Sequence, residues 1–232
     1  MYGTPYKIKT YSIESAHRLI VQTEHQAEML SQGYNRSAIV IKSPMDLNQK
    51  FPRGPQSKTL LWVGRSDERV KRPSLALELA RRLPEFIFVV IMNKGLPETH
   101  AQCLEEAKRI SNVTLIEWVP FAEIERYFAN ARLHLNTSVF EGFPNTFLQA
   151  AKYGVPTVSL KVDPGDMLTK HGCGFTCEDD LVRMVTTVRS LMSDPACYTR
   201  LSEANLSYMH KYHDKDTIIP QYEKVFQEVL AR

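Results

Sequence analysis

Short apolar segments recur along this sequence and are separated by stretches with the spacing of helices. Each segment is rich in Val, Ile, Leu and Phe and is closed by Gly, Pro, Asn or Lys. The segments are residues 38–42, 59–64, 86–92, 113–118, 133–136 and 156–160. Several are apolar at successive positions, which is typical of strands buried on both faces. Such strands belong to parallel sheets that helices cover on both sides.

The stretches between these segments have amphipathic patterns with recognisable ends. Pro73 stands at a first-turn position, and Pro84 stops a run in which leucine recurs every four residues. Residues 99–110 and 122–131 are similar amphipathic segments. The sequence therefore predicts the α/β fold class, with a doubly wound, Rossmann-like parallel sheet and right-handed crossovers.

The two ends of the chain have other patterns. Residues 19–21 predict one strand without partners, followed by a helix that opens at Thr23 with Gln26 three residues later, as in a capping box. After Asp179 the pattern predicts helices with no further strand. The final segment, residues 218–230, carries a wide apolar face.

Composition excludes several classes of protein. The 43% of hydrophobic and 24% of charged residues lie in the globular range. The formal net charge of +3 comes without a basic stripe that has interleaved aromatics, so we expect no nucleic-acid partner. The longest apolar run, residues 86–92, is far shorter than the roughly 20 residues of a membrane helix. The N-terminus lacks a secretory pattern, and we expect a cytoplasmic protein.

The cysteines do not indicate a disulfide framework or a metal site. The sequence has four of them: Cys103, Cys173, Cys177 and Cys197. Their spacing predicts free thiols in a reducing cytosol. His171 lies near two of them, but Cys-x-x-x-Cys with one histidine lacks the usual zinc spacing and a fourth ligand. We therefore expect no metal.

The loop after the strand at 59–64 carries a group of cations. Arg65, Lys71 and Arg72 precede the helix that begins near Pro73. In an open parallel sheet, ligands bind beyond the carboxyl ends of the strands, and a helix N-terminus there carries about half a positive charge. The loop is therefore a candidate anion site. The alternative is a solvated basic loop that its own two acidic residues balance.

A second loop follows the strand at 133–136. Gly142 permits a backbone conformation that a Cβ would obstruct, and Asn145 or Thr146 is placed to cap the next helix. The amides of that first turn can then face a phosphate. Glu141 is an acceptor for hydroxyl groups near the same point, although a lone acidic loop residue is more often only solvated.

This second loop carries a signature that is found again in a known family. Glu-Gly-Phe-Pro at 141–144 is followed by a helix and by Ala-x-x-Gly-Val-Pro at 151–156. Its context is present in order along the chain: Gly64-Arg65 with Lys71, Asn93-Lys94-Gly95, Trp118-Val119-Pro120 and Asp163-Pro164-Gly165. The pattern resembles the donor site of group 1 glycosyltransferases with the GT-B fold.

The resemblance implies a domain organisation. Residues 38–232 resemble the C-terminal, nucleotide-sugar-binding half of such an enzyme, including its C-terminal helices. Residues 1–37 resemble a remnant of the N-terminal acceptor domain, namely its last strand-helix unit. The rest of that domain, about 150 residues by domain-size norms, is expected before this segment.

The resemblance also assigns roles to residues. Arg65 and Lys71 are expected to contact the donor pyrophosphate and Glu141 the sugar hydroxyls, which makes these three the expected catalytic residues. Family members place the nucleobase of the donor near Asn93 and residues 118–121. The other expected donor-binding residues are Gly64, Asn93, Trp118, Val119, Phe121, Gly142, Phe143, Pro144, Asn145, Thr146 and Gln149.

Gln149 departs from the family pattern, in which a second glutamate stands at this position and contacts the ribose. Glutamine still accepts a hydrogen bond but loses the charge-assisted increment of about 1 kcal/mol. A structural alternative is a capping box, in which the Gln149 amide bonds back to the Thr146 backbone. The two interpretations are partly compatible.

The function implied by the resemblance is transfer of a sugar from a UDP- or GDP-linked donor, with retention of configuration. No cofactor is expected and no metal is required, because the two cations and a helix N-terminus can stabilise the departing diphosphate; we also expect no Asp-x-Asp metal motif. This chain would be the donor-binding half, inactive alone. The alternatives are a non-catalytic nucleotide-sugar-binding or interaction module and a GT-B-type sugar-nucleotide epimerase.

The expected partners follow from the same resemblance. They are the nucleotide-sugar donor and, through the missing N-terminal domain, an acceptor glycan or lipid-linked saccharide. Peripheral association with the inner membrane face is compatible with such an acceptor. The unpaired strand at 19–21 and the apolar face at 218–230 predict self-association or mobility of these elements. The alternative is that residues 1–35 fold onto the C-terminal helix.

Overall fold

The structure is a computed structural model that describes residues 6–54 and 58–231. The chain forms two compact units. The first unit comprises residues 1–47 and 210–232, and the second comprises residues 48–209.

The second unit is built on a six-stranded sheet in which all paired strands are parallel. Its strands are β3 (Thr59–Arg65), β4 (Ile87–Asn93), β5 (Val113–Ile116), β6 (Leu133–Asn136), β7 (Thr157–Ser159) and β8 (Gly174–Thr176). Their order across the sheet is β5-β4-β3-β6-β7-β8. The chain thus moves outward from β3 to one edge and then returns to β6 on the other side of β3. This is the doubly wound Rossmann order, so the predicted fold class is confirmed.

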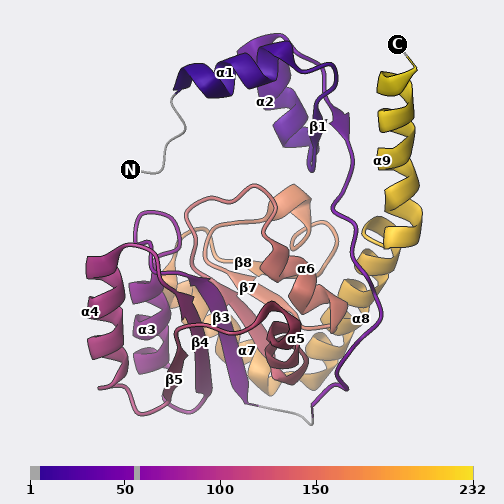
Figure 1. The fold of residues 1–232 in the computed structure, drawn as a ribbon. Coiled ribbons are helices and arrows are strands. Elements are labelled where there is room, and N and C mark those ends of the chain that lie inside the picture. Colours follow the sequence, from indigo (N-terminus) through magenta and orange to yellow (C-terminus); the bar gives the residue numbers. More distant parts are fainter. Residues whose placement is uncertain (1–5, 55–57, 232) are drawn as a thin grey trace. The chain divides into compact units, whose positions relative to one another are not determined.

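Helices cover both faces of this sheet (Figure 1). They are α3 (Pro73–Arg82), α4 (Pro97–Ala107), α5 (Phe121–Asn130), α6 (Asn145–Lys152), the 3₁₀ turn η1 (Pro164–Asp166), α7 (Leu181–Ser193) and α8 (Pro195–Tyr212), which runs on into the first unit. Leu60 and Trp62 of β3 pack with α3, α4 and α7, whereas Leu61 packs with α5 and α6. Successive strand side chains point to opposite faces, which explains why the strands are apolar at successive positions.

One strand of this sheet was not predicted. Residues 174–176 form β8 beside β7, although the sequence Gly-Phe-Thr has no apolar run. Gly174 is required there because a Cβ would lie 1.9 Å from the carbonyl oxygen of Thr157. The other predicted strands of the sheet and the helices agree with the observed elements to within a few residues at their ends.

The first unit contains a smaller βαβ element. Its elements are α1 (Tyr6–Ser15), β1 (Ile20–Val21), α2 (Glu24–Tyr34), β2 (Ile39–Val40) and α9 (Lys215–Leu230). Thr23 caps α2 in the predicted capping box with Gln26. β1 and β2 pair in parallel, so the prediction that the strand at 19–21 has no partner is wrong. The segment at 38–42 pairs with β1 instead of joining the larger sheet.

Apolar residues of β1 and β2 pack against α9 within the first unit. Ile41, Ile218 and Val225 form the buried cluster, and Ile20 and Ile39 pack against it. The contact agrees with the alternative in which the N-terminal segment folds onto the C-terminal helix. On α9, Phe226 and Leu230 remain exposed.

None of the helices in the described ranges combines the length and the apolar character that a bilayer crossing requires.

Candidate functional site

The candidate site residues lie at the carboxyl edge of the large sheet, around the point where the strand order reverses. Arg65 ends β3, Asn93 ends β4 and Asn136 ends β6. β3 lies between β4 and β6, so the loops after these strands are neighbours. Crevices at such a switch point are where ligands bind in open α/β sheets.

Lys71 and Glu141, which the sequence assigned to different parts of a ligand, contact each other. The Lys71 ammonium and the Glu141 carboxylate form an ion pair, and Ser138 Oγ donates a hydrogen bond to Glu141 Oε1 at 2.7 Å. Their side chains are 20% and 13% exposed, so both groups are accessible although largely enclosed. The site therefore presents a cation and a hydrogen-bond acceptor side by side.

Arg72 ties the loops after β3 and β6 together. Its Nε donates to the carbonyl of Thr137 at 2.6 Å, while Thr137 Oγ1 donates to the carbonyl of Lys71 at 2.6 Å. The guanidinium also pairs with Asp179 at 2.7 Å, and this hydrogen bond lowers the pKa of that carboxyl. Sequence reasoning placed Arg72 among the anion ligands, but the structure commits it to carbonyls and a carboxylate. Its backbone, with φ of 50°, is left-handed.

Arg65 and Asn93 lie opposite each other in the pairing of β3 with β4, and both are exposed. Gly64 precedes Arg65, and a Cβ there would meet the ring of Trp62 at 2.7 Å. The strand pairing thus places Arg65 and Asn93 side by side at the carboxyl edge of the sheet.

The loop after β5 presents aromatic side chains. Trp118 is 69% exposed and Phe121, the first residue of α5, is 85% exposed, while Val119 between them is half-buried. Exposed rings of this size can stack on a flat ligand such as a nucleobase. Because β5 lies next to β4, these rings and Asn93 belong to neighbouring loops.

The N-terminus of α6 differs from the prediction in its capping. Pro144 occupies the N-cap position and, among the residues that the structure describes, no side chain caps the helix, so the prediction of an Asn145 or Thr146 cap is wrong. Both residues lie inside the first turn, where the Thr146-Gln149 capping box also cannot form. A helix start leaves its first amides without intrahelical partners, which suits an anion.

The remaining predicted residues of this loop divide by exposure. Gly142 and Asn145 are exposed, whereas Phe143 and Pro144 are buried and hold the loop on the core. Thr146 and Gln149 are half-buried on α6. The loop thus exposes its backbone and small polar groups, and the buried Phe143 and Pro144 anchor it.

Among the residues that the structure describes, no group of three or more His, Cys, Asp or Glu side chains is placed to hold a metal ion. Cys173 is buried, and burial raises its pKa to about 12, so the thiol keeps its proton. The sequence does contain one Asp-x-Asp triplet, Asp214-Lys215-Asp216, so the expectation of none is wrong. Asp214 caps α9 by accepting the Asp216 amide.

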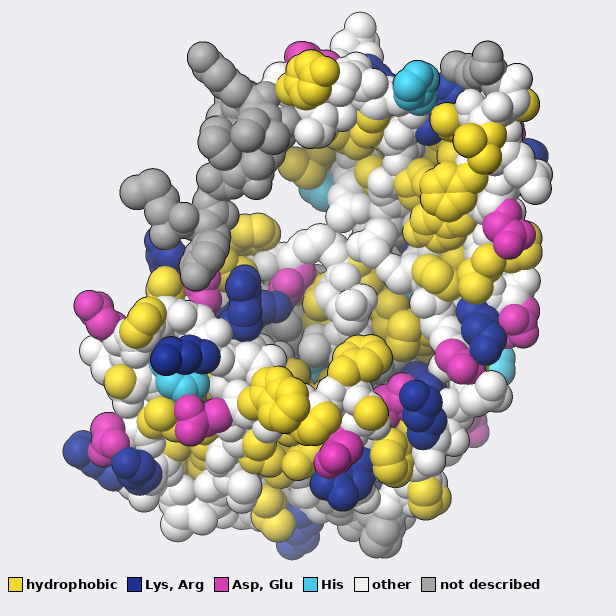
Figure 2. All heavy atoms as spheres, in the orientation of Figure 1, with side chains coloured by type: hydrophobic (Ala, Val, Ile, Leu, Met, Phe, Trp, Pro, Cys, Tyr) yellow, Lys and Arg dark blue, Asp and Glu magenta, His cyan; other side chains and the backbone are white. Residues whose placement is uncertain are grey.

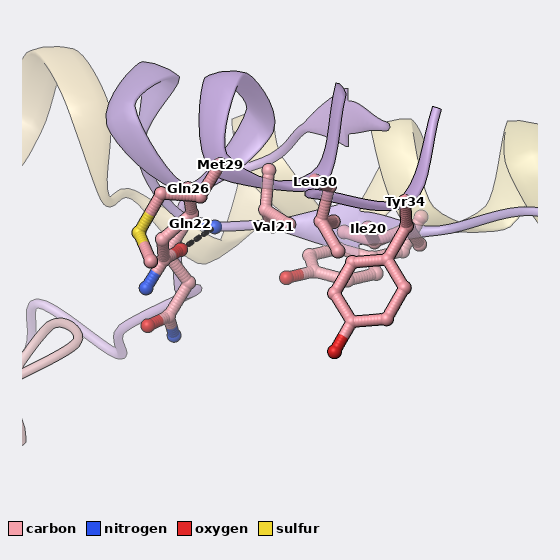
Figure 3. A pocket seen from close by; sticks show the side chains of 8 residues that line it. Ile20, Val21, Gln22, Gln26, Met29, Leu30 and Tyr34 are labelled. Carbon is pink, nitrogen blue, oxygen red and sulfur yellow. Dashed lines mark hydrogen bonds between the residues drawn. The ribbon is translucent and has the colours of Figure 1, made fainter. Parts of the chain in front are cut away.

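Charged side chains of both signs are interspersed on the face drawn in Figure 2, rather than gathered in one stripe. A separate groove of about 630 Å³ belongs to the first unit (Figure 3). It is lined mainly by apolar side chains of β1 and α2, including Ile20, Met29 and Tyr34. The candidate site residues all belong to the second unit.

Two curated proteins are similar to this chain in sequence. It is 22% identical over 207 residues to an uncharacterized glycosyltransferase of Haemophilus influenzae, covering 84% of this chain and 57% of that protein. It is 25% identical over 167 residues to the lipopolysaccharide 1,6-galactosyltransferase of Salmonella typhimurium, covering 66% of this chain and 45% of that protein. The chain thus spans about half the length of the curated relatives it matches.

A solved structure shares the fold. The structure of Anabaena HepE in complex with UDP and glucose superposes with a TM-score of 0.82 at 16% identity, over 96% of this chain and 66% of HepE. This likeness identifies the described fold with that of GT-B glycosyltransferases.

The family model described as glycosyl transferases group 1 matches residues 57–194, from the start of the large sheet to the end of α7. The match includes the loops that carry Arg65, Lys71, Asn93, Trp118 and Glu141. Because it extends over more than half of the sequence, the chain belongs to the group 1 glycosyltransferases.

Proposed function

We propose that the protein transfers a sugar from a nucleoside diphosphate sugar to an acceptor with retention of configuration, and that this chain is its donor-binding half. The observation that carries the proposal is the Lys71–Glu141 pair at the switch point of the sheet. It puts a cation for the diphosphate next to an acceptor for sugar hydroxyls.

The departing diphosphate gains negative charge as the glycosidic bond breaks. Arg65, Lys71 and the N-terminus of α6 are the groups that would stabilise this charge, and this is the role that a divalent metal has in other transferases. The proposal therefore includes no metal requirement. Ser138 would keep Glu141 in place when phosphate oxygens compete for Lys71.

The base would lie against the loops after β4 and β5, where Asn93 offers an amide and Trp118 and Phe121 offer exposed rings. The HepE structure contains UDP, which makes a uridine donor the first one to test here.

Calorimetric titration of this chain with UDP and GDP tests the proposal. Arg65→Ala or Lys71→Ala removes a charge-assisted hydrogen bond, so we expect affinity to fall about tenfold to a hundredfold. Lys108→Ala is the control, because that exposed lysine pairs with Glu105 at the far end of α4. Affinity that survives both site variants, or is lost on chelation of divalent ions, would overturn the proposal.

Gln149 favours a second candidate, a non-catalytic nucleotide-sugar-binding module. Without a carboxylate at this position the ribose contact is weaker, which suits binding without turnover. If Gln149 faces the ribose, Gln149→Glu should tighten donor binding by a few-fold. Donor turnover by the longer protein would decide against the module.

A further inference from the structure

His100 of α4 is buried and connects two loops at the carboxyl edge of the sheet. Its Nδ1 lies 3.2 Å from Ser66 Oγ, and its Nε2 lies 2.8 Å from a carboxylate oxygen of Glu117. Ser66 follows β3 and Glu117 follows β5, so the imidazole spans the strand that lies between them.

Ser66 extends this connection to the loop after β4. It is fully buried, its Oγ accepts the Gly95 amide at 2.7 Å, and its own amide donates to the carbonyl of Asn93 at 2.9 Å. The carbonyl of Ser66 accepts the Leu96 amide at 2.8 Å. One serine therefore holds both ends of the turn from 93 to 96.

Every side chain in this network has a polar partner. Ser66 Oγ accepts from the Gly95 amide and also lies within hydrogen-bond distance of the Asn93 carbonyl and of Nδ1 of His100. Nε2 of His100 contacts Glu117. With a polar partner at each ring nitrogen, the imidazole is held in one orientation.

The two loops also approach too closely to move independently. A Cβ on Gly95 would lie 2.8 Å from the carbonyl oxygen of Ser66. Any change in the position of Ser66 therefore shifts the turn that follows β4.

Each end of the network adjoins a residue of the candidate donor site. Ser66 follows Arg65, Gly95 lies two residues after Asn93, and Glu117 precedes Trp118. We propose that Ser66, His100 and Glu117 are positioning residues that set the spacing of the turn that starts at Asn93 and of Trp118 for the nucleoside part of the donor. The inference rests on the proposed function and deepens it.

The network does not act as a nucleophilic triad. Ser66 has no exposed surface, and its hydroxyl contacts the imidazole from inside the core. Its contribution is to orient groups that touch the ligand, and the strand ends β3, β4 and β5 are the elements it aligns.

The test distinguishes a specific effect on the residues that would bind the nucleoside from a general loss of folded structure. In calorimetric titrations, His100→Ala should weaken UDP or GDP binding about tenfold, while inorganic pyrophosphate binds as in the wild type. His100→Asn keeps a polar atom in place of Nδ1 for the contact with Ser66 and should recover most of the affinity. Exposed His25→Ala is the control. Equal binding of the nucleotide by His100→Ala, or equal losses for nucleotide and pyrophosphate, would overturn the proposal.

Amide hydrogen exchange without ligand provides a readout that does not depend on the proposed function. In His100→Ala, and in Ser66→Ala as a second variant, exchange at Gly95 and Leu96 should accelerate at least about tenfold relative to wild type. Unchanged exchange at these amides would refute the network. If wild-type protein binds neither nucleotide, the proposed function fails, and the exchange result alone then decides whether the network orients this turn.

Discussion

Glu141 lies between a cation and a hydroxyl, and the two neighbours act on it differently. Lys71 neutralises its charge, whereas Ser138 orients the carboxylate without neutralising it. A ligand phosphate that attracts Lys71 would leave Glu141 ionised and still oriented. In the proposed function, Glu141 would then accept hydrogen bonds from sugar hydroxyls when the anionic part of the ligand is bound.

Glu141→Ala should therefore separate the two parts of the donor. We expect binding of the free nucleoside diphosphate to stay within about threefold of wild type, because Lys71 remains, while intact donor binds about tenfold more weakly. Parallel calorimetric titrations with UDP and UDP-sugar measure both values. Equal losses for the two ligands would show that Glu141 does not contact the sugar.

Arg72 combines a strained backbone with three oxygen partners. Its left-handed φ of 50° costs free energy that glycine would not incur, whereas its bonds to Thr137 and Asp179 stabilise the loops. We expect both Arg72→Gly and Arg72→Ala to lower the free energy of unfolding. The alanine variant should be less stable than the glycine variant by about 1 kcal/mol, because only it keeps the strain.

Urea unfolding followed by tryptophan fluorescence measures this difference, since Trp62 and Trp118, the two tryptophans, both lie in the second unit. An alanine variant as stable as the glycine variant would mean that the backbone relaxes out of the left-handed region.

The strands that could be predicted from sequence are those buried on both faces. β3 and β4 are apolar at successive positions because α3 and α5 cover opposite sides of them, and this pattern is visible in one sequence. β8 has three residues and includes a glycine, so it lacks that pattern. The segment at 38–42 was recognised as a strand, but an apolar run does not say which strand it pairs with.

The sequence predicts those candidate site residues that belong to local motifs. It does not predict contacts between residues that are far apart in the sequence. Arg65 ends β3, Lys71 and Glu141 stand in the loops after β3 and β6, and the family resemblance depends on these residues. The contact of His100 with Ser66 and Glu117 spans three elements, and no spacing in the sequence indicates it. The role of Arg72 was missed for the same reason, since its charge alone resembles that of a ligand-binding arginine.

The pairing of β8 with β7 depends on Gly174. Because an added Cβ would lie 1.9 Å from the Thr157 carbonyl oxygen, Gly174→Ala must displace the strand. We expect the free energy of unfolding of the second unit to fall by at least about 2 kcal/mol. Tryptophan-detected urea unfolding measures it.

Gly33→Ala is the control for this substitution, because no atom of the described residues lies within 4 Å of a Cβ at that helical position. It should not lower stability, since alanine is the better helix former. A Gly174 variant as stable as the wild type would show that β8 can shift without loss.

At the scale of the whole molecule, binding and transfer are separate questions. The candidate donor residues all belong to the second unit, so titrations of this chain test donor binding directly. The chain spans about half of its curated relatives, and the transfer reaction is therefore a proposal about the longer protein.

Stability of the second unit should depend on pH through His134. This histidine of β6 is fully buried between Phe128 and Phe147, and its Nδ1 contacts Thr157 Oγ1 at 3.1 Å. Within the described part of the chain its Nε2 has no hydrogen-bond partner. Burial lowers its pKa to about 3, and the nearby charge of Lys71 adds to this effect. The imidazole is therefore neutral in the native protein.

In the unfolded chain the same imidazole has a pKa of about 6.5, so between pH 6.5 and 3 the unfolded state binds a proton that the native state does not. The stabilisation from this residue is present above pH 6.5 and is lost as the pH falls. From pH 7 to pH 5 the loss should be about 2 kcal/mol.

Tryptophan-detected urea unfolding at several pH values measures this loss, and the wild type is compared with His134→Leu and His134→Asn. Both variants should lack this component of the pH dependence, although only asparagine retains a polar contact for Thr157. If the free energy of unfolding of either variant falls as steeply between pH 7 and pH 5 as that of the wild type, His134 is not the residue responsible.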